Sequence, residues 1–187
     1  MQLQQENKKP DNRNIIDWYK YWTTDAIKAD LNRKKFSYSV LCLNISGDFN
    51  IGTVIRNCNA FCASHVYIAG NKKWDRRGSV GSHNYLNISY IPLDKLDDLI
   101  KDFDIVGVDN VPTAENISTF NWPKNPLIVF GEENNGIGDF LKKCQKIIYI
   151  EQHGSVRSLN VGSASAIVLN NWCEKNLDGL QKGKRTT

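Results

Sequence analysis

The stretch Ile150–Leu169, IEQHGSVRSLNVGSASAIVL, decides how the rest of the chain is interpreted. It has the pattern of a strand end, a polar loop with a glycine, and a helix start that Ser158 or Asn160 can cap by accepting hydrogen bonds from free backbone amides. Residues 162–166 are almost all small, so the helix backbone can approach another group closely. Simple close packing would explain these small residues alone. The long polar loop before them favours a helix start that closes around a bound cofactor.

Around this stretch, short apolar segments alternate with helical patterns. We expect strands at residues 38–43, 66–69, 88–91, 105–108, 127–130 and 147–150, and helices at 52–63, 93–100, 137–142 and 160–176. Residues 113–124 have no regular pattern. The alternation predicts an α/β fold in which a mostly parallel sheet is covered by helices on both faces.

The chain has 187 residues, which suits one domain with short extensions. We expect a polar, partly helical N-terminal extension over residues 1–37, the main domain over 38–177, and a basic disordered tail over 178–187. Between residues 15 and 31, aromatic side chains recur near helical spacing. We expect them to pack on the chain's own core, with docking on a partner as the alternative.

Composition restricts the function only loosely. The net charge of +4 permits an anionic partner without requiring one. The five cysteines form no CxxC pair, so we expect buried thiols in a reducing, cytoplasmic environment rather than zinc ligands. We also expect no signal peptide and no membrane span, because no apolar run is long enough.

Loops that carry glycine and polar residues follow three of the expected strands, at the edge where parallel sheets bind ligands. They are residues 44–52, residues 131–136 and the loop of the opening stretch. Neither GxGxxG nor GxxxxGK[ST] is present, so an ordinary dinucleotide site and a P-loop are not supported. The acids of residues 131–136 lack the EF-hand spacing, so we expect no metal; Glu133 could instead cap the turn at Gly136.

Cations near these loops suggest an anionic ligand. Arg56, in the helix after the first loop, suits bidentate binding of a phosphate, although a solvated surface arginine is the ordinary alternative. Residues 70–84 gather four cations around Trp74, a pattern for phosphate binding with base stacking that a solvated loop would explain equally well. These cations are Lys72, Lys73, Arg76 and Arg77. His83 adds a possible base or ribose contact.

The three loops together resemble the signature motifs of the SpoU (TrmH-like) RNA ribose 2′-O-methyltransferases of the SPOUT superfamily. Residues 50–56 (NIGTVIR) resemble N-x-G-x-x-x-R, residues 130–137 (FGEENNGI) resemble G-x-E-x-x-G, and residues 150–166 resemble I-P-x-x-G-x-x-x-S-L-N-V-x-x-A. The resemblance covers residues 38–172. Glu151 stands at the family's usual proline, and Cys62 stands where glycine commonly follows phenylalanine. Neither departure removes a group assigned to the chemistry.

The resemblance implies S-adenosylmethionine as cofactor, a C-terminal trefoil knot, and a homodimer whose sites are completed across the interface. It implies that the cofactor lies against Leu127, Phe130, Gly131, Glu132, Ile150, Gly154, Ser158, Leu159 and Asn160. The residues expected to catalyse or to shape the pocket are Asn50, Arg56, Glu133, Ser158 and Asn160. The residues expected to contact RNA are Lys72, Lys73, Arg76, Arg77, His83 and Arg157.

The implied reaction is attack of a ribose 2′-oxygen of tRNA or rRNA on the cofactor's methyl group. Arg56 is the family's usual candidate for the base, but arginine keeps its proton in proteins. We therefore favour a hypothesis in which Arg56 grips the substrate phosphate while phosphate or water takes the proton. Two alternatives stay open: an RNA-binding module with this fold and no catalysis, and, with less support, an unrelated small-molecule α/β enzyme.

Overall fold

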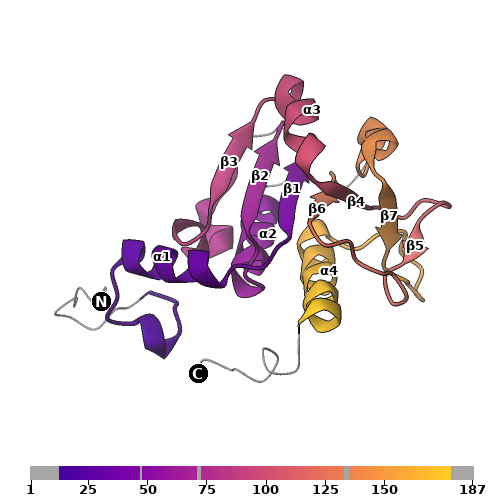
Figure 1. Cartoon of the computed structure of the whole chain (residues 1–187). Coiled ribbons are helices and arrows are strands. Elements are labelled where there is room, and N and C mark those ends of the chain that lie inside the picture. Colours follow the sequence, from indigo (N-terminus) through magenta and orange to yellow (C-terminus); the bar gives the residue numbers. More distant parts are fainter. Residues whose placement is uncertain (1–12, 47, 71–72, 133–134, 178–187) are drawn as a thin grey trace.

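The protein is a sheet of parallel strands covered by helices on both faces, as seen in a computed structural model that describes residues 13–46, 48–70, 73–132 and 135–177 (Figure 1). The expected disordered tail therefore lies outside the described residues. The seven strands have the order β3-β2-β1-β6-β4-β7-β5, and every paired strand is parallel to its neighbours. The predicted α/β class is confirmed.

The strands are short, and two strands in the middle of the sheet are completely buried. They are β1 (Ser39–Leu43), β2 (His65–Ala69), β3 (Ile88–Ile91), β4 (Asp104–Val108), β5 (Glu115–Asn116), β6 (Pro126–Phe130) and β7 (Lys146–Tyr149). All five residues of β1 and of β6 are buried. This explains why both segments are continuously apolar rather than alternating, since helices cover both of their faces.

The helices lie between the strands along the chain. The α-helices are α1 (Thr24–Lys34), α2 (Asp48–Ala60), α3 (Leu96–Leu99) and α4 (Val161–Asn176). The 3-10 helices are η1 (Asp17–Tyr19), η2 (Arg76–Ser79), η3 (Ser82–Asn84), η4 (Leu93–Lys95), η5 (Ile100–Asp102) and η6 (Gly138–Lys143). In the described part of the chain, no helix has the length and apolar character needed to cross a bilayer.

Alternate side chains of the strands pack into two separate hydrophobic cores, one on each face of the sheet. Val40, Cys42 and Ile128 belong to the core under α2 and α4, whereas Leu41 and Leu127 belong to the core on the opposite face, with residues of α3 and η6. Two-residue periodicity in β1 and β6 therefore assigns each side chain to one layer. A third, small cluster around Tyr19 joins the N-terminal extension to the residues after η3.

Four predicted boundaries were wrong in detail. The helix expected at residue 52 begins at Asp48, so most of the expected first loop is already helical and Asn50 lies in the first turn. Residues 113–124 contain β5, the strand expected to reach residue 150 ends at Tyr149, and the polar loop of residues 70–84 contains η2 and η3. Local pattern could not reveal β5, because its two residues are strand only through pairing with β7.

Candidate active site

A cavity of about 900 Å³ opens at the carboxyl ends of β4, β6 and β7. Its wall combines the loop after β4, the loop after β6, and the segment that runs from β7 to α4. This is the edge at which parallel α/β sheets bind ligands, and the volume falls within the range of small-molecule sites, roughly 300–1,000 Å³. Two of the three loops singled out in the sequence therefore meet at one cavity.

The loop after β6 is folded tightly onto itself. The Glu132 and Gly136 backbones exchange hydrogen bonds, with N···O distances of 3.0 and 2.9 Å. A Cβ atom on Gly131 would lie 1.9 Å from the Gly136 carbonyl oxygen, so the turn requires glycine at residue 131. Asp109, which follows β4, accepts a hydrogen bond from the Ile137 amide at 3.0 Å and holds the far end of this loop.

The segment between β7 and α4 is anchored at both ends. Asn160 is the N-cap of α4, and its Oδ1 accepts from the amides of Gly162 and Ser163 at 2.9 and 3.3 Å. Its Nδ2 donates to Asn50 Oδ1 at 2.9 Å, which ties α4 to the start of α2. Of the two predicted caps, Asn160 is therefore the one that acts.

Close packing of α2 on α4 explains the small residues at the start of α4. Asn57 donates from Nδ2 to the Gly162 carbonyl at 2.8 Å and to Ser165 Oγ at 2.9 Å. A Cβ atom on Gly162 would lie 2.7 Å from the Thr53 methyl carbon. Small residues are thus needed here for contact with α2, while the loop that precedes them lines the cavity. Close packing therefore explains the small residues, and cofactor binding by the loop stays a prediction.

Arg56 lies on the exposed side of α2 and is not among the residues that line the cavity. With 3.6 residues per turn, Phe49, Arg56 and Ala60 fall within about 40° of one another, and all three are exposed. Arg56 makes no hydrogen bond or ion pair with another described residue. Its guanidinium therefore remains available for an external anion beside the α2–α4 contact.

The structure brings most of the predicted cofactor residues together. Those that line the cavity are Phe130, Gly131, Glu132, Ile150, Ser158 and Leu159, and Arg157 joins them from the RNA-contact prediction. Leu127 is fully buried within β6, and neither Gly154 nor Asn160 belongs to the cavity wall. Glu133 and Lys72 lie outside the described residues.

Two of the predicted RNA-contact residues between residues 73 and 84, Arg77 and His83, make specific contacts. Arg77 donates to both carboxylate oxygens of Asp75, and its guanidinium lies 5.4 Å from the centre of the Phe49 ring. His83 Nδ1 is hydrogen bonded to Ser79 Oγ at 2.6 Å, and burial together with the positive charge of Arg76 lowers the pKa of His83. The Lys73 and Arg76 side chains are exposed.

The cysteines do not form a reactive centre. All five are free, and burial raises the pKa of each thiol, to about 12 for Cys42 and about 11 for Cys144. A raised pKa keeps a thiol protonated and poorly nucleophilic. Among the described residues, no group of three or more His, Cys, Asp and Glu side chains is arranged to hold a metal ion.

Asp109, Asn110 and Gln152 are among the cavity residues that the sequence interpretation missed. Asn110 donates to the Arg157 carbonyl at 3.2 Å and so links the loop after β4 to the loop before α4. Asp109 and Asn110 follow β4 directly, so the same carboxyl-end rule that selected the other loops could have found them. Gln152 Oε1 is buried in the cavity wall and has no hydrogen-bond partner among the described residues.

Comparison with known protein families identifies the family of this chain. The model of the SpoU rRNA Methylase family matches residues 37–170, which include all three motif loops. The chain belongs to the SpoU rRNA methylase family. The family resemblance noted in the sequence is thereby confirmed.

Individual SpoU relatives are distant in sequence. The chain is 26% identical over 151 residues to the tRNA (guanosine(18)-2′-O)-methyltransferase of Aquifex aeolicus, covering 76% of this chain and 72% of the relative. It is 23% identical to the mouse tRNA (guanosine(18)-2′-O)-methyltransferase TARBP1, covering 84% of this chain but only 11% of that much longer protein.

Solved structures of SpoU proteins share the fold. The crystal structure of the A. aeolicus TrmH/SpoU tRNA modifying enzyme has a TM-score of 0.73 at 22% identity, covering 86% of this chain and 84% of that one. The AdoMet-bound rRNA methyltransferase from Sinorhizobium meliloti has a TM-score of 0.69 at 20% identity, covering 79% of this chain and 61% of that one.

Proposed function

We propose that this protein transfers a methyl group from S-adenosylmethionine to the ribose 2′-hydroxyl of a tRNA or rRNA. The main support for the proposal is that residues of the second and third family motifs line the same cavity. The chain also belongs to a family of RNA methylases. The related A. aeolicus protein is named for 2′-O-methylation of tRNA guanosine 18, which supports the reaction class.

The cavity has properties that suit this cofactor. Its volume of about 900 Å³ leaves room for a nucleoside with an amino-acid side chain, and apolar residues such as Val108 and Ile150 share the wall with polar ones. The unpartnered Gln152 Oε1 is an acceptor that an amino group of the cofactor would satisfy. Backbone groups of Gly131, Ile150 and Leu159 would hold the cofactor in the manner that the resemblance implies.

The protein's own contribution to the reaction is orientation and charge. The bound cofactor supplies an electrophilic methyl group. Arg56 binds a phosphate of the RNA through its planar donors and so fixes the neighbouring ribose hydroxyl. The hydroxyl proton passes to the phosphate or to water, because arginine retains its own proton. Ser158 and Arg157 lie in the cavity wall, where Arg157 contributes a further phosphate contact. Asn160 and Asn50 are hydrogen bonded to each other and hold the segment before α4 against α2. The pocket-shaping role expected of Glu133 stays a prediction.

A homodimer is part of the proposal, because Arg56 and the cavity wall are separate surfaces in one copy of the chain. Phe49, Leu159 and Ile167 are exposed by 53%, 36% and 42% around the α2–α4 contact. These exposed apolar side chains lie on α2, on α4 and just before α4, and we propose that they belong to one interface. A second copy packed on this face would cover them and bring Arg56 of one subunit toward the cavity of the other.

The C-terminal trefoil knot also belongs to the proposal. Residues 150–160 lead from β7, near one edge of the sheet, to α4, which packs on α2. On the way they are held to the loop after β4 by the hydrogen bond between Asn110 and the Arg157 carbonyl. This path supports threading of the last segment through a loop. We also propose a cytoplasmic location, which the free thiols support, and chemistry without a resident metal.

Methyl transfer to defined RNAs tests the proposed function. Transcribed tRNAs and rRNA fragments would be incubated with the protein and S-adenosylmethionine labelled in its methyl group, and the label mapped by nuclease digestion. We expect label in a 2′-O-methylnucleoside, and none when the same nucleotide is supplied as its 2′-deoxy form. Label in a base, or cofactor binding without transfer to any RNA, would overturn the proposal; the second result would favour the non-catalytic RNA-binding module.

A further inference from the structure

The aromatic side chains of the N-terminal extension face in two directions. Tyr19 is buried, and Trp22 packs with it in the small cluster that also holds Ile27 and Tyr85. Trp18 and Tyr21, by contrast, are exposed by 59% and 58%. The expectation that this segment docks on the chain's own core therefore accounts for only half of its aromatic residues.

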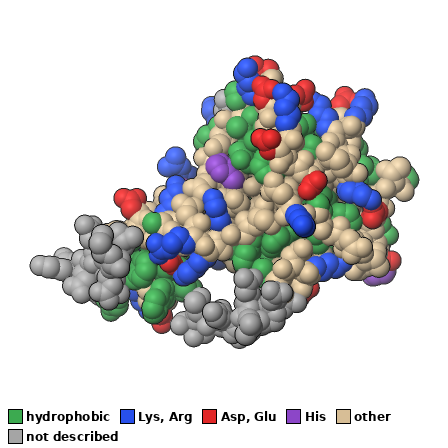
Figure 2. Space-filling model, viewed as in Figure 1, with side chains coloured by type: hydrophobic (Ala, Val, Ile, Leu, Met, Phe, Trp, Pro, Cys, Tyr) green, Lys and Arg blue, Asp and Glu red, His purple; other side chains and the backbone are tan. Residues whose placement is uncertain are grey.

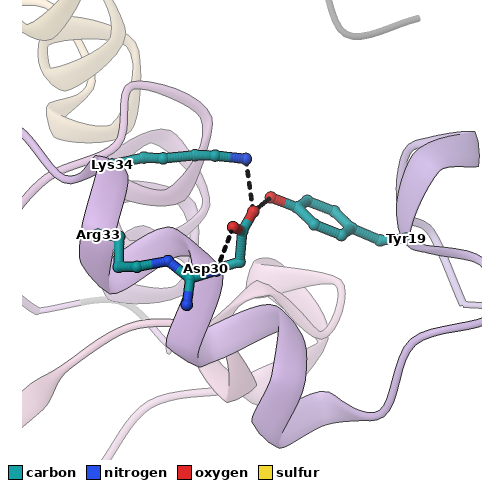
Figure 3. A network of polar contacts seen from close by, with 4 residues as sticks. All are labelled: Tyr19, Asp30, Arg33 and Lys34. Atoms are coloured by element: carbon teal, nitrogen blue, oxygen red, sulfur yellow. Dashed lines mark hydrogen bonds and ion pairs between the residues drawn. The ribbon is translucent and has the colours of Figure 1, made fainter. Parts of the chain in front are cut away.

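A polar network fixes the segment on α1, so the exposed rings are held outward. The Tyr19 hydroxyl donates to Asp30 Oδ2 at 2.7 Å, and Asp30 also accepts from Arg33 and Lys34 (Figure 3). Burial works against ionisation of Asp30, but the hydrogen bonds from Lys34, Tyr19 and Arg33 outweigh it and lower the pKa of this carboxyl. The network thus keeps Asp30 ionised at neutral pH.

Backbone contacts add to this anchoring. Arg13 donates to the Trp22 carbonyl at 2.7 Å and to Thr24 Oγ1 at 2.9 Å, which closes the turn between η1 and α1. The Trp18 ring of η1 packs against the Trp22 ring, with the ring centres 6.2 Å apart. Trp18 is therefore supported on one side by Trp22 and remains largely accessible to solvent.

The segment that carries these rings has a net positive charge. Residues 13–37 contain six Lys and Arg residues and three Asp residues. Of the three carboxylates, Asp30 is buried within its network and Asp17 is paired with Lys20. Figure 2 shows Lys and Arg side chains over α1, next to hydrophobic side chains at its N-terminal end. Asp17 and Asp25 are the two exposed acids, so the six cations outnumber them over the segment as a whole, with Arg33 and Lys34 in the last turn of α1.

We propose that Trp18 and Tyr21 form a stacking platform for unpaired bases of the RNA substrate, with the cations of α1 on the adjoining phosphates. Exposed aromatic rings next to a basic surface are the combination that single-stranded RNA requires, since bases stack on the rings while phosphates meet the cations. A protein partner is less well matched, because the centres of protein interfaces are poor in lysine. The inference rests on the proposed function and adds an RNA contact outside the family motifs.

Alanine substitution of both rings tests the platform. Base stacking contributes about 1–3 kcal/mol per base, so at the lower end the W18A/Y21A variant should bind RNA about 30-fold more weakly than the unmodified protein. The probe is a fluorescein-labelled transcript of a tRNA anticodon or D arm, titrated by anisotropy at fixed salt. W18F/Y21F keeps the rings and should retain most of the affinity. L93A removes an exposed apolar side chain from η4 and should leave RNA binding unchanged.

Parallel measurements separate the failure of the platform from failure of the proposed function. The affinity for S-adenosylmethionine and the melting temperature should be the same in W18A/Y21A as in the unmodified protein. RNA affinity within twofold of the unmodified protein would overturn the platform alone. A loss of dimer mass in light scattering at unchanged RNA affinity would assign the rings to a protein interface instead. If the unmodified protein binds cofactor but no RNA, both the platform and the proposed substrate class are wrong.

Discussion

The Asn160 side chain has two roles: it caps the N-terminus of α4, and it hydrogen bonds to Asn50 in the first turn of α2. Two substitutions of Asn160 distinguish these roles. Asn160→Ala removes the acceptor for two backbone amides and the donor to Asn50. Loss of an N-cap costs about 1 kcal/mol, and loss of the side-chain hydrogen bond costs about 1 kcal/mol more. For a chain of this size 1 kcal/mol corresponds to roughly 2–4 °C, so the melting temperature should fall by about 4–8 °C.

Asn160→Asp is the matched control. A carboxylate still accepts from the Gly162 and Ser163 amides, and its charge is favourable at a helix N-terminus, but it cannot donate to Asn50. We expect a loss of at most about 1 kcal/mol, measured by urea denaturation at pH 7. If Asn160→Asp loses as much stability as Asn160→Ala, the contact with Asn50, rather than the cap, holds the start of α4, and the reasoning about the cap is refuted.

Four further predictions address the cavity, the guanidinium, the dimer and the N-terminal network. Gly131→Ala should reduce S-adenosylmethionine affinity at least tenfold in calorimetry, because the new Cβ would lie 1.9 Å from the Gly136 carbonyl oxygen; unchanged affinity would show that the turn is not part of the site. Arg56→Lys keeps the charge but loses the planar donors, so methyl transfer should fall at least tenfold while cofactor affinity stays constant, and full activity would exclude bidentate binding. Phe49→Asp places a charge on the proposed interface and should convert the dimer to a monomer in light scattering; a dimer that persists would place the interface elsewhere. The lowered pKa of Asp30 means that its contribution to stability is complete above about pH 5 and is lost as the pH falls below the ordinary Asp pKa and through the lowered pKa of the folded state. Asp30→Asn should therefore be less stable at pH 7 and show a flatter loss of stability between about pH 5 and pH 3, and parallel acid curves for the two proteins would contradict this.

Much of the fold followed from local sequence pattern. Continuous apolar runs identified β1 and β6 because both strands are buried on both faces, and the capping residue Asn160 marked the start of α4. The start of α2 was placed four residues late, because Asp48–Ile51 carry polar residues and a pattern that also suits a loop. The strand β5 was missed, since only its pairing with β7 makes two residues a strand.

The sequence predicted those parts of the candidate site that belong to the family motifs. Gly131, Ile150 and Leu159, which the resemblance assigns to the cofactor, line one cavity. Their contact with the cofactor stays a prediction. Gln152 was not predictable, because its significance lies in a buried oxygen that lacks a partner, which only the packing reveals. The different exposure of Tyr19 and Trp18 was equally hidden, since a turn of 3-10 helix sets adjacent side chains about 120° apart and only packing decides which of them is buried.

A crystal structure of the protein with S-adenosylhomocysteine tests the central claim most directly. The account predicts density for the ligand between the loop after β6 and the loop before α4, with hydrogen bonds to backbone atoms of Gly131, Ile150 and Leu159. It also predicts a ligand amino group within hydrogen-bond distance of Gln152 Oε1. A ligand bound elsewhere, or one that touches neither loop while the cavity holds only solvent, would contradict the account.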